Sequence, residues 1–384
     1  MLNRAQQIQD QLSHWRRDIH MHPELGFEEV RTAALVSGVL DALGYRVRSG
    51  VGRTGVVGER GAGSPVVAIR ADMDALPIQE ENQVPYASTK PGVMHACGHD
   101  AHTAMALGVA TLLAEESFPG TVRFLFQPSE EKSDEEGFSG AQRMAQDGAM
   151  EGVDAVLALH VHAGTPVGEI SVGAGPVSAG VDTFSATING RGAHGAYPHK
   201  GTDPIHVAAH VILALHGIVS RRLNPFDAAV ITVGTVHAGQ ASNVIPEKVD
   251  LSGTIRYENP DVQSTLHREM DRAMAIARTM GGEYELEIRT GSPPVVNDKR
   301  IADLLQEVAG EMLGTGQVTA REKGMGAEDF SEFTNLAPGA MFRLGCQIED
   351  DPREGHHPRF DLDERCLPIG AAILAETALR LLRQ

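Results

Sequence analysis

Short apolar runs that alternate with helical patterns restrict the fold of this chain more strongly than any other feature of its sequence. Each run is long enough for one strand, and the runs lie at 65–69, 121–126 and 154–159. Runs without polar residues are typical of strands buried on both faces. Helical periodicity precedes and separates them, at 3–20, 28–43 and 101–116. Strand–helix–strand alternation predicts an α/β fold with a mostly parallel sheet and helices on both faces.

The pattern changes after Gly173-Ala174-Gly175-Pro176, where apolar and polar residues begin to alternate. The alternating segments lie at 184–188, 229–233 and 249–256, and helical patterns lie at 203–221 and 260–280. One-sided alternation is typical of an antiparallel sheet with one open face. We interpret this region as a smaller inserted α+β domain, and Ser292-Pro293-Pro294 marks the return of the chain. The predicted ranges are 1–180 and 293–384 for the first domain and 181–292 for the insert.

Composition excludes several classes of partner. The formal net charge of -18 repels phosphate backbones and anionic membranes, so neither nucleic acid nor a membrane surface is expected as a partner. No stretch of about 18 apolar residues exists, and no membrane span is expected. The chain has 3 cysteines, which cannot all pair. A reducing compartment, the cytoplasm, fits this cysteine content.

Polar residues follow each of the three buried runs directly. Asp72 and Asp74 come after the first run, Glu130 and Glu131 after the second, and His160 after the third. Ligands of open α/β sheets bind at the carboxyl ends of the strands. The sequence therefore predicts a functional site where these carboxylates and imidazoles meet.

Metal-ligating residue types also precede the helix predicted at 101–116. Cys97 and His99 are two residues apart, so in an extended segment both side chains point the same way and can reach one ion. Thiolate, imidazole and carboxylate are ligands of zinc and neighbouring metals. Together with Glu131 and His160, Cys97 and His99 exceed the three protein ligands that one tetrahedral catalytic ion needs. A further histidine from 356–357 gives a set that suits two divalent ions with shared ligands.

Each of these residues also has a plainer interpretation. A Cys-x-His pair is common by chance, and Asp100 fits the N-cap of the following helix. Glu130 and Glu131 begin an acidic run, which is usually a solvated loop. His160 alone is more often a partly buried structural histidine. The metal hypothesis rests on the convergence of the set, and no P-loop or Gly-x-Ser-x-Gly motif offers another chemistry.

The same segments resemble a known family. Met94-His95-Ala96-Cys97-Gly98-His99-Asp100, after Arg70-Ala71-Asp72-Met73-Asp74, is similar to the M20 peptidases. The most similar branch is the amidohydrolases, with hippurate hydrolases, auxin-conjugate hydrolases, N-acetyl-diaminopimelate deacetylases and aminoacylases. The resemblance covers nearly the whole chain. Further matching segments lie at 20–27, 127–131, 192–195, 243–246, 253–256 and 326–330.

The resemblance implies a catalytic domain with two divalent ions (Zn, Mn, Co or Ni) and an inserted lid or dimerisation domain. It implies that the chain forms a homodimer through the insert, or a higher homo-oligomer. The implied metal ligands are Cys97, His99, Glu131, His160 and a C-terminal histidine. Glu130 would be the general base. In the insert, His194 would reach the site of the partner subunit, and Asn243 and Arg256 would hold the carboxylate of the substrate.

The chain departs from the family pattern in one loop, and near its C-terminal signature two histidines compete for one role. An acidic loop at 132–139 replaces a short glycine-rich stretch, and it can change access or substrate choice. The C-terminal signature, His-x-Pro-x-aromatic, is met by His356 two residues before Pro358, while His357 is a close rival. Asp74 is expected to orient the ligands through hydrogen bonds, or else to be a turn residue before Pro77.

The expected activity is metal-dependent hydrolysis of the amide bond in small N-acyl amino acids or related amino-acid conjugates. Glu130 would activate a water that bridges the two ions. One alternative is a dipeptidase or carboxypeptidase of the same family. Another, from a different class, is a non-catalytic protein that binds amino-acid conjugates; loss of the ligands or of Glu130 would favour it, and both are retained.

Overall fold

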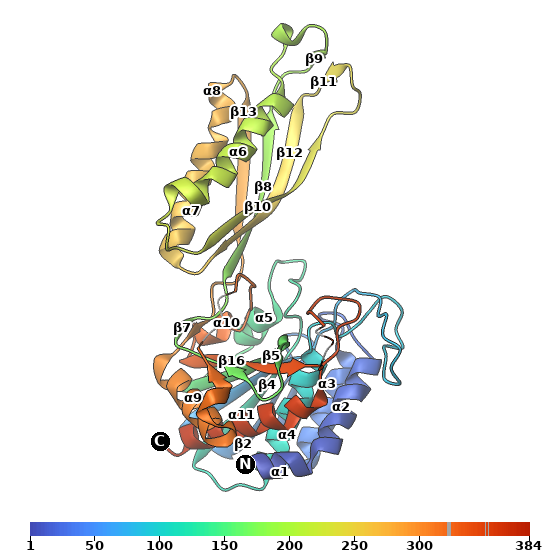
Figure 1. The fold of residues 1–384 in the computed structure, drawn as a ribbon, viewed down its shortest axis with the longest axis vertical. Helices are drawn as coiled ribbons and strands as arrows, with labels where there is room; N and C mark the ends of the chain where they lie inside the picture. Colours follow the sequence, from blue (N-terminus) through green and yellow to red (C-terminus); the bar gives the residue numbers. More distant parts are fainter. Residues whose placement is uncertain (321–323, 350, 352) are drawn as a thin grey trace. The chain divides into compact units, whose positions relative to one another are not determined.

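The structure is a computed structural model that describes residues 1–384 except 321–323, 350 and 352. The chain divides into two compact units (Figure 1). The smaller unit contains Ser178–Val295 and a short later segment that ends at Glu328. The rest of the described chain forms the larger unit. The sequence suggested 181–292 for the insert and gave no sign of the later segment.

The larger unit is built on an eight-stranded sheet. Its order is β1 (Arg46–Val51), β2 (Gly55–Ala62), β4 (Gly120–Gln127), β3 (Val66–Asp72), β5 (Ala155–Pro166), β16 (Gly339–Gln347), β6 (Ile170–Ser171) and β15 (Val318–Thr319). The four central strands, β4-β3-β5-β16, are parallel to one another. The edge pairs β1–β2 and β2–β4 are antiparallel. The predicted α/β class with a mainly parallel sheet is confirmed.

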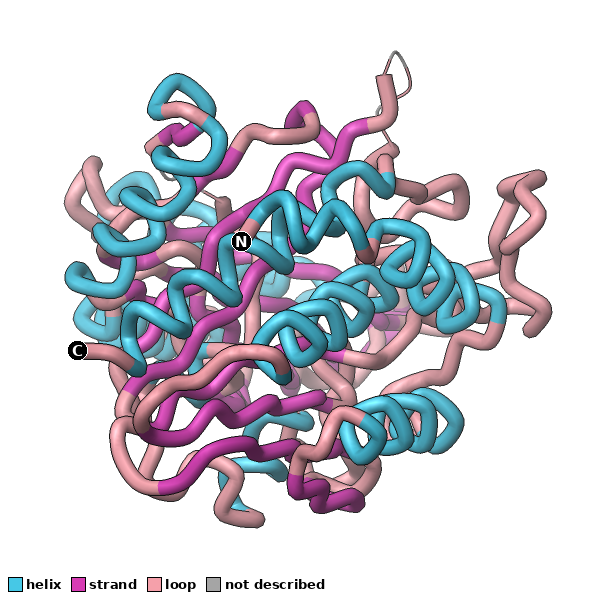
Figure 2. Tube along the Cα trace, turned by 90° about the horizontal axis from the view of Figure 1, so that it is seen from below, coloured by secondary structure: helices cyan, strands magenta, loops and turns pink. Residues whose placement is uncertain are grey.

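Helices cover both faces of this sheet. Residues 67–72 of β3 are all buried, and because successive side chains of a strand point to opposite faces, both faces must be covered. The helices are α1 (Leu2–Gln7), α2 (Gln9–Met21), α3 (Val30–Ala42), α4 (His99–Ala114), α5 (Gly140–Gln146), α9 (Lys299–Leu313), α10 (Ser331–Thr334) and α11 (Leu367–Leu382). Figure 2 shows several of them crossing the twisted strands. The single helix predicted at 3–20 is interrupted at Ile8.

The smaller unit contains a four-stranded antiparallel sheet in the order β10-β12-β8-β13. Its strands are β8 (Gly180–Asn189), β10 (Ala229–Ala238), β12 (Lys248–Tyr257) and β13 (Glu283–Thr290). The helices α6 (Pro204–Arg222), α7 (Pro260–Met274) and α8 (Ile276–Thr279) pack with the sheet around a separate hydrophobic cluster. This unit therefore has its own core, as expected of an inserted α+β domain.

Helix α6 is apolar and 19 residues long, which meets the length and composition of a membrane span. It nevertheless buries Val207, Val211, Leu215 and Ile218 in the core of the smaller unit. A core helix of a globular unit meets the same criterion, so the helix gives only weak support for a membrane span.

The chain leaves the larger unit and returns to it at neighbouring points. β7 (Gly175–Pro176) pairs antiparallel with β14 (Val296–Asn297) as a two-stranded sheet. The outgoing and returning strands therefore lie side by side. The two segments of the larger unit that flank the insert are adjacent in space although the insert separates them in sequence.

Candidate metal centre

Three parallel strands bring the predicted polar residues to one edge of the sheet. β3 leads to Asp74, β4 leads to Glu130 and Glu131, and β5 carries His160. Because these strands are parallel and adjacent, their carboxyl ends meet. The site thus forms from residues that lie far apart in the sequence but leave the sheet at the same place.

The start of α4 supplies two further side chains, Cys97 and His99. Gly98, between them, has φ +93°, and a Cβ on it would lie 2.4 Å from Val161 Cγ2. Only glycine adopts this left-handed conformation at such close approach without strain. Gly98 is the N-cap residue of the helix, so the N-cap interpretation of Asp100 is wrong. Asp100 instead lies buried in the first turn and pairs with Arg16.

The donor atoms form two overlapping groups. One group comprises Cys97, His99 and His160, and the other comprises Cys97, Glu131 and His356; within each, the ligand atoms lie within 4.8 Å of one another. Cys97 belongs to both groups. Sulfur, imidazole nitrogen and carboxylate oxygen are the donors that first-row divalent metals take. The residues present therefore fit two ions that share one thiolate.

The two C-terminal histidines have different surroundings. His356 Nε2 lies 2.9 Å from Glu131 Oε1. The residue has φ +61°, and its backbone N–H donates to Ala96 O at 2.7 Å. His357 is exposed, and its Nδ1 accepts the N–H of Arg359 at 3.1 Å. Of the two rivals, His356 is the one whose ring lies beside a predicted ligand.

Burial and neighbouring groups shift the pKa values of the candidate ligands. Burial raises the pKa of the Cys97 thiol and lowers the pKa of His160, which His102 lowers further. The hydrogen bond to Glu131 raises the pKa of His356. Since a bound ion requires a thiolate and neutral imidazoles, metal binding at this site releases protons.

Asp74 connects two of the candidate ligands. Its Oδ2 accepts the N–H of Glu131 at 3.0 Å, and its Oδ1 lies 3.1 Å from His99 Nδ1, which also lies 2.9 Å from Asp74 O. These acceptors hold a proton on Nδ1, so Nε2 is the nitrogen that would coordinate an ion. The buried Nε2 has no hydrogen-bond partner among the described residues. Asp74 thus orients the His99 ring, as carboxylates beside metal ligands do.

Asp72, which the sequence places after the first buried run, and His102, which it did not select, also belong to the site. His102 Nδ1 lies 2.6 Å from Asp72 Oδ1, and its Nε2 accepts the N–H of Val161 at 3.0 Å. Both ring nitrogens are used, so His102 orients the strand that carries His160 and leaves no lone pair for a metal. Arg70 fixes Asp72 at 2.6 Å. A carboxylate at the end of a buried strand was the only signal for Asp72.

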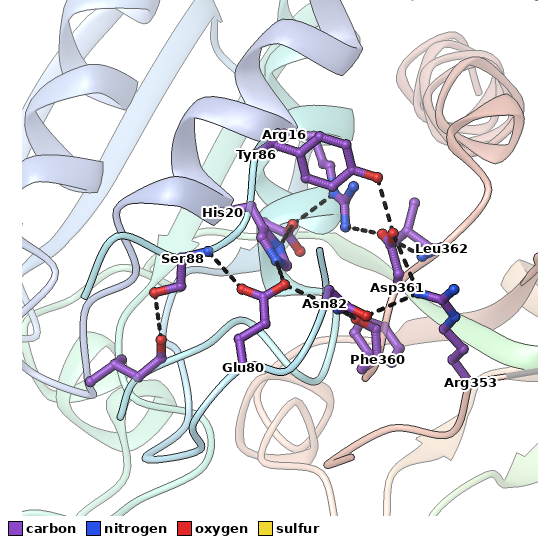
Figure 3. A network of polar contacts seen from close by, with 12 residues as sticks. Arg16, His20, Glu80, Asn82, Tyr86, Ser88, Arg353, Phe360, Asp361 and Leu362 are labelled. Carbon is purple, nitrogen blue, oxygen red and sulfur yellow. Dashed lines mark hydrogen bonds and ion pairs between the residues drawn. The ribbon is translucent and has the colours of Figure 1, made fainter. Parts of the chain in front are cut away.

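A buried polar network ties the ligand-bearing segments together (Figure 3). Arg16 of α2 pairs with Asp100 and with Asp361, each at 2.8 Å. His20 lies between Asp100, at 2.8 Å, and Glu80, at 3.3 Å. The network therefore joins α2, the start of α4, the loop around residue 80 and the loop that follows His356.

Three predicted site residues belong to the smaller unit. His194 lies in β9 (Ala193–His194), which pairs with β11 (Val244–Ile245) directly after Asn243. Arg256 lies near the other end of β12, where it pairs with Val181, while Lys248 pairs with Asn189. The smaller unit therefore brings His194 and Asn243 together and keeps Arg256 apart from them.

A pair of donor sets that share a thiolate, at the carboxyl edge of an α/β sheet, defines a dinuclear metalloenzyme centre. Residues 68–380 match the model of the peptidase family M20/M25/M40. The chain belongs to this family.

Similar proteins extend over almost the whole chain. N-acetyl-L-cysteine deacetylase of Bacillus subtilis is 38% identical, over 98% of this chain and 89% of its own length. IAA-amino acid hydrolase ILR1-like 4 of Arabidopsis thaliana is 40% identical, over 96% of this chain and 84% of its own length. The solved structure of the Bacillus subtilis YXEP protein, a dinuclear metal binding peptidase from the M20 family, has a TM-score of 0.85 and 35% identity over 98% of this chain and 99% of its own.

The family, its relatives and the donor set agree on the class of enzyme. The protein is a metal-dependent amidohydrolase with a dinuclear metal centre.

Proposed function

We propose that this enzyme hydrolyses the amide bond of small N-acyl amino acids or related amino-acid conjugates. The observation that carries the proposal is the carboxylate of Glu130, whose oxygen lies within 4.8 Å of donor atoms of His99 and Glu131. A carboxylate beside a metal centre can move a proton between water and a leaving nitrogen. Two relatives support this substrate class: one is named as an N-acetyl-L-cysteine deacetylase and the other as an IAA-amino acid hydrolase.

The proposed ligands are Cys97, His99, Glu131, His160 and His356, with Asp74 holding two of them in place. Zn, Mn, Co or Ni would satisfy this mixed donor set. Two such ions, when bound, polarise the amide carbonyl and make a water acidic. A shared thiolate needs a reducing compartment to remain a ligand, which supports the cytoplasm as the place of action.

A residue beside the metals would transfer a proton from the attacking water to the leaving nitrogen. Glu130 removes a proton from the attacking water, which adds to the amide carbon. Glu130 then delivers that proton to the leaving nitrogen, so that a free amine and a carboxylate result. During both steps, Asp74 holds Glu131 and His99 in fixed positions through the hydrogen bonds described above.

We propose that His194 and Asn243 act in the site of a second subunit, and that Arg256 acts in its own. His194 Nδ1 accepts the N–H of Ala196 at 3.1 Å, so the ring's proton is on Nε2 and is available for a developing oxyanion. From Lys248 to Arg256, β12 extends roughly 26 Å at about 3.3 Å per residue. A small substrate cannot touch both ends of this strand, so His194 and Arg256 of one chain would serve two different substrates.

The smaller unit offers a surface for this homodimer. The outer face of α6 exposes Ile205 and Leu213, the latter at 72% of its surface. β10 is an edge strand, and Val230 and Val236 on it are exposed. An edge strand beside an apolar helix face is typical of a surface that pairs with a second copy. Pairing of such dimers into a higher oligomer is compatible with this surface.

A carboxypeptidase or dipeptidase activity is the second candidate. It is favoured by the solved relative described as a peptidase, whose fold covers almost the same length. A dipeptide carries a free amino group where an N-acyl amino acid has none, so direct comparison of the two substrate classes separates the candidates. A non-catalytic binding role would require a site without a proton carrier, and Glu130 counts against it.

The test uses purified protein that is stripped of metal and then reconstituted with Zn, Mn, Co or Ni. Metal content is measured alongside the hydrolysis of N-acetyl amino acids, N-benzoyl amino acids and dipeptides. We expect activity only with metal, and a higher kcat/KM for the N-acyl substrates. Full activity after verified metal removal would overturn the two-metal proposal, and preference for dipeptides would select the second candidate.

A further inference from the structure

The turn that carries Glu130 has an uncommon backbone conformation. Ser129, the residue before it, is buried and has φ +43°, in the left-handed region that residues with a Cβ seldom adopt. Such a conformation persists only where surrounding contacts hold it, and it is common at functional sites. The contacts that hold Ser129 therefore decide where the Glu130 side chain points.

Glu29 makes the most direct of these contacts. It is fully buried at the start of α3, and its Oε1 accepts the N–H of Ser129 at 2.8 Å. Its Oε2 accepts the hydroxyl of Thr54, from the turn between β1 and β2. Its side chain does not cap its own helix, because the carboxylate of Glu24 accepts the first N–H groups there.

Other contacts further restrict the conformation of the turn at Ser129. Ser129 Oγ donates to Lys132 O at 2.7 Å, and Ser129 O accepts the N–H of Gly140 at 2.9 Å. A Cβ on Gly26 would lie 2.2 Å from Ser129 Oγ, so the chain before Glu29 packs directly on the serine. The backbone N–H, the hydroxyl and the carbonyl of Ser129 are therefore all hydrogen-bonded. Of these three partners, only Glu29 contributes a carboxylate.

Two buried carboxylates thus hold the backbone on either side of Glu130. Glu29 accepts the N–H of Ser129, and Asp74 accepts the N–H of Glu131. Asp74 also holds His99, so its loss would disturb the metal ligands directly. The hydrogen bonds of Glu29 go to Ser129 and Thr54, neither of which is a proposed ligand. The effect of Glu29 on Glu130 is therefore separable from metal binding.

We infer that Glu29 is a positioning residue that fixes the Glu130 carboxylate for proton transfer by holding the backbone of Ser129. The inference rests on the proposed role of Glu130 as general base. Displacement of a reacting group by about 1 Å can cost about 100-fold in rate. Loss of the Glu29 hydrogen bond should therefore lower kcat and leave substrate binding and metal content largely unchanged.

The test compares Glu29→Met with Glu29→Gln. Methionine fills the buried space but accepts no hydrogen bond, and we expect kcat to fall roughly 10- to 100-fold, with KM within about threefold of the wild type. Glutamine keeps an oxygen for the Ser129 N–H and should restore most of kcat. Both variants should bind the wild-type amount of metal. A wild-type kcat for Glu29→Met, or equal losses for both variants, would overturn the inference.

Glu24→Gln is the matched control, because Glu24 is a carboxylate of the same segment that bonds only the start of α3 through its side chain. It should lower stability without changing kcat. Hydrogen exchange of the peptide that covers 127–131 gives a readout independent of activity: exchange should accelerate in Glu29→Met and not in Glu24→Gln. If Glu29→Met does not fold, Thr54→Val loosens the same carboxylate and should lower kcat a few-fold; an unchanged kcat there would contradict the inference. An inactive wild type would instead refute the proposed function.

Discussion

At the residue scale, the neighbouring residues Glu130 and Glu131 have different proposed roles. Glu131 lies against His356 and is held by Asp74 through its backbone, whereas Glu130 lies within 4.8 Å of His99 and Glu131. We expect Glu130→Gln to keep its metal and to lose roughly 10²- to 10⁴-fold in kcat, the contribution of a general base. Glu131→Gln should lose metal. Metal analysis of both variants is the check, and the reverse pattern would exchange the two roles.

Glu29 also affects how stability depends on pH. Burial and the charge of Asp74 raise the pKa of Glu29 from 4.5 to about 7. The folded state then holds a proton that the unfolded state releases, so this group costs stability as pH rises from about 4.5 to 7. That difference corresponds to about 3 kcal/mol. In metal-free protein, the free energy of unfolding of Glu29→Gln should therefore increase relative to that of the wild type as pH rises from about 4.5 to 7.

Urea unfolding of both proteins at pH 4.5 and pH 8 checks this expectation. A constant difference in unfolding free energy between the two proteins at the two pH values would show that Glu29 titrates normally in the folded chain.

The candidate ligands could be found from the sequence because each follows an apolar run or lies beside a glycine turn, as His160 and Cys97 do. Glu29 and His102 could not be found in this way. Their partners are set by the tertiary fold: Glu29 bonds Ser129 across 100 positions, and His102 bonds Val161 across 59. Nothing local to these residues indicates such contacts, and their periodicity is that of ordinary helix and strand positions.

At the scale of elements, the guanidinium of Arg16 ties α2 to α4 and to the loop after His356. Its side chain is fully buried and pairs with Asp100 and Asp361. Breaking a buried pair by removing one partner leaves an uncompensated charge and costs about 3–5 kcal/mol. Arg16→Met should therefore lower the free energy of unfolding by that amount and weaken metal binding, because Asp100 follows His99.

Arg17→Met provides the comparison for this variant. Arg17 is half exposed and pairs with Glu364 at 2.7 Å. An exposed ion pair contributes about 0–1 kcal/mol, so this variant should resemble the wild type. Denaturant unfolding together with metal titration measures both effects; similar losses in the two variants would mean that the buried network does not stabilise the ligand-bearing elements.

Several elements with strong periodicity were predicted, with ends within a few residues, as α4 and β4 illustrate. Other elements were not predicted, among them the strands β16 and β13. β16 contains Gly339, Arg343 and Gly345 within its length, so it lacks a continuous apolar run even though it lies in the centre of the sheet. β13 alternates glutamate with apolar residues at an exposed edge, where charges dominate its composition. Neighbouring strands, more than intrinsic preference, make these two segments extended.

At the scale of the whole molecule, the proposed exchange of His194 between subunits has a quantitative consequence. Homodimers of His194→Ala and of Glu130→Gln should each be nearly inactive. In a mixed dimer one site would contain both wild-type residues and the other would contain neither. With random assortment about half of the dimers are mixed, so roughly a quarter of wild-type activity should return. Absence of recovery, despite demonstrated subunit exchange, would place His194 in its own subunit's site or outside the chemistry.

The insertion of the smaller unit between β7 and β14 also bears on the order in which the chain can fold as it is made. The hydrophobic cluster of the smaller unit can be completed once Ile288 of β13 has emerged from the ribosome. The larger unit must wait, because β16 lies between β5 and β6 and His356 follows it. Domains fold as units during synthesis. The first-made part of the larger unit must therefore remain open while the insert matures, and the ions can enter a complete ligand set only after His356 has been made.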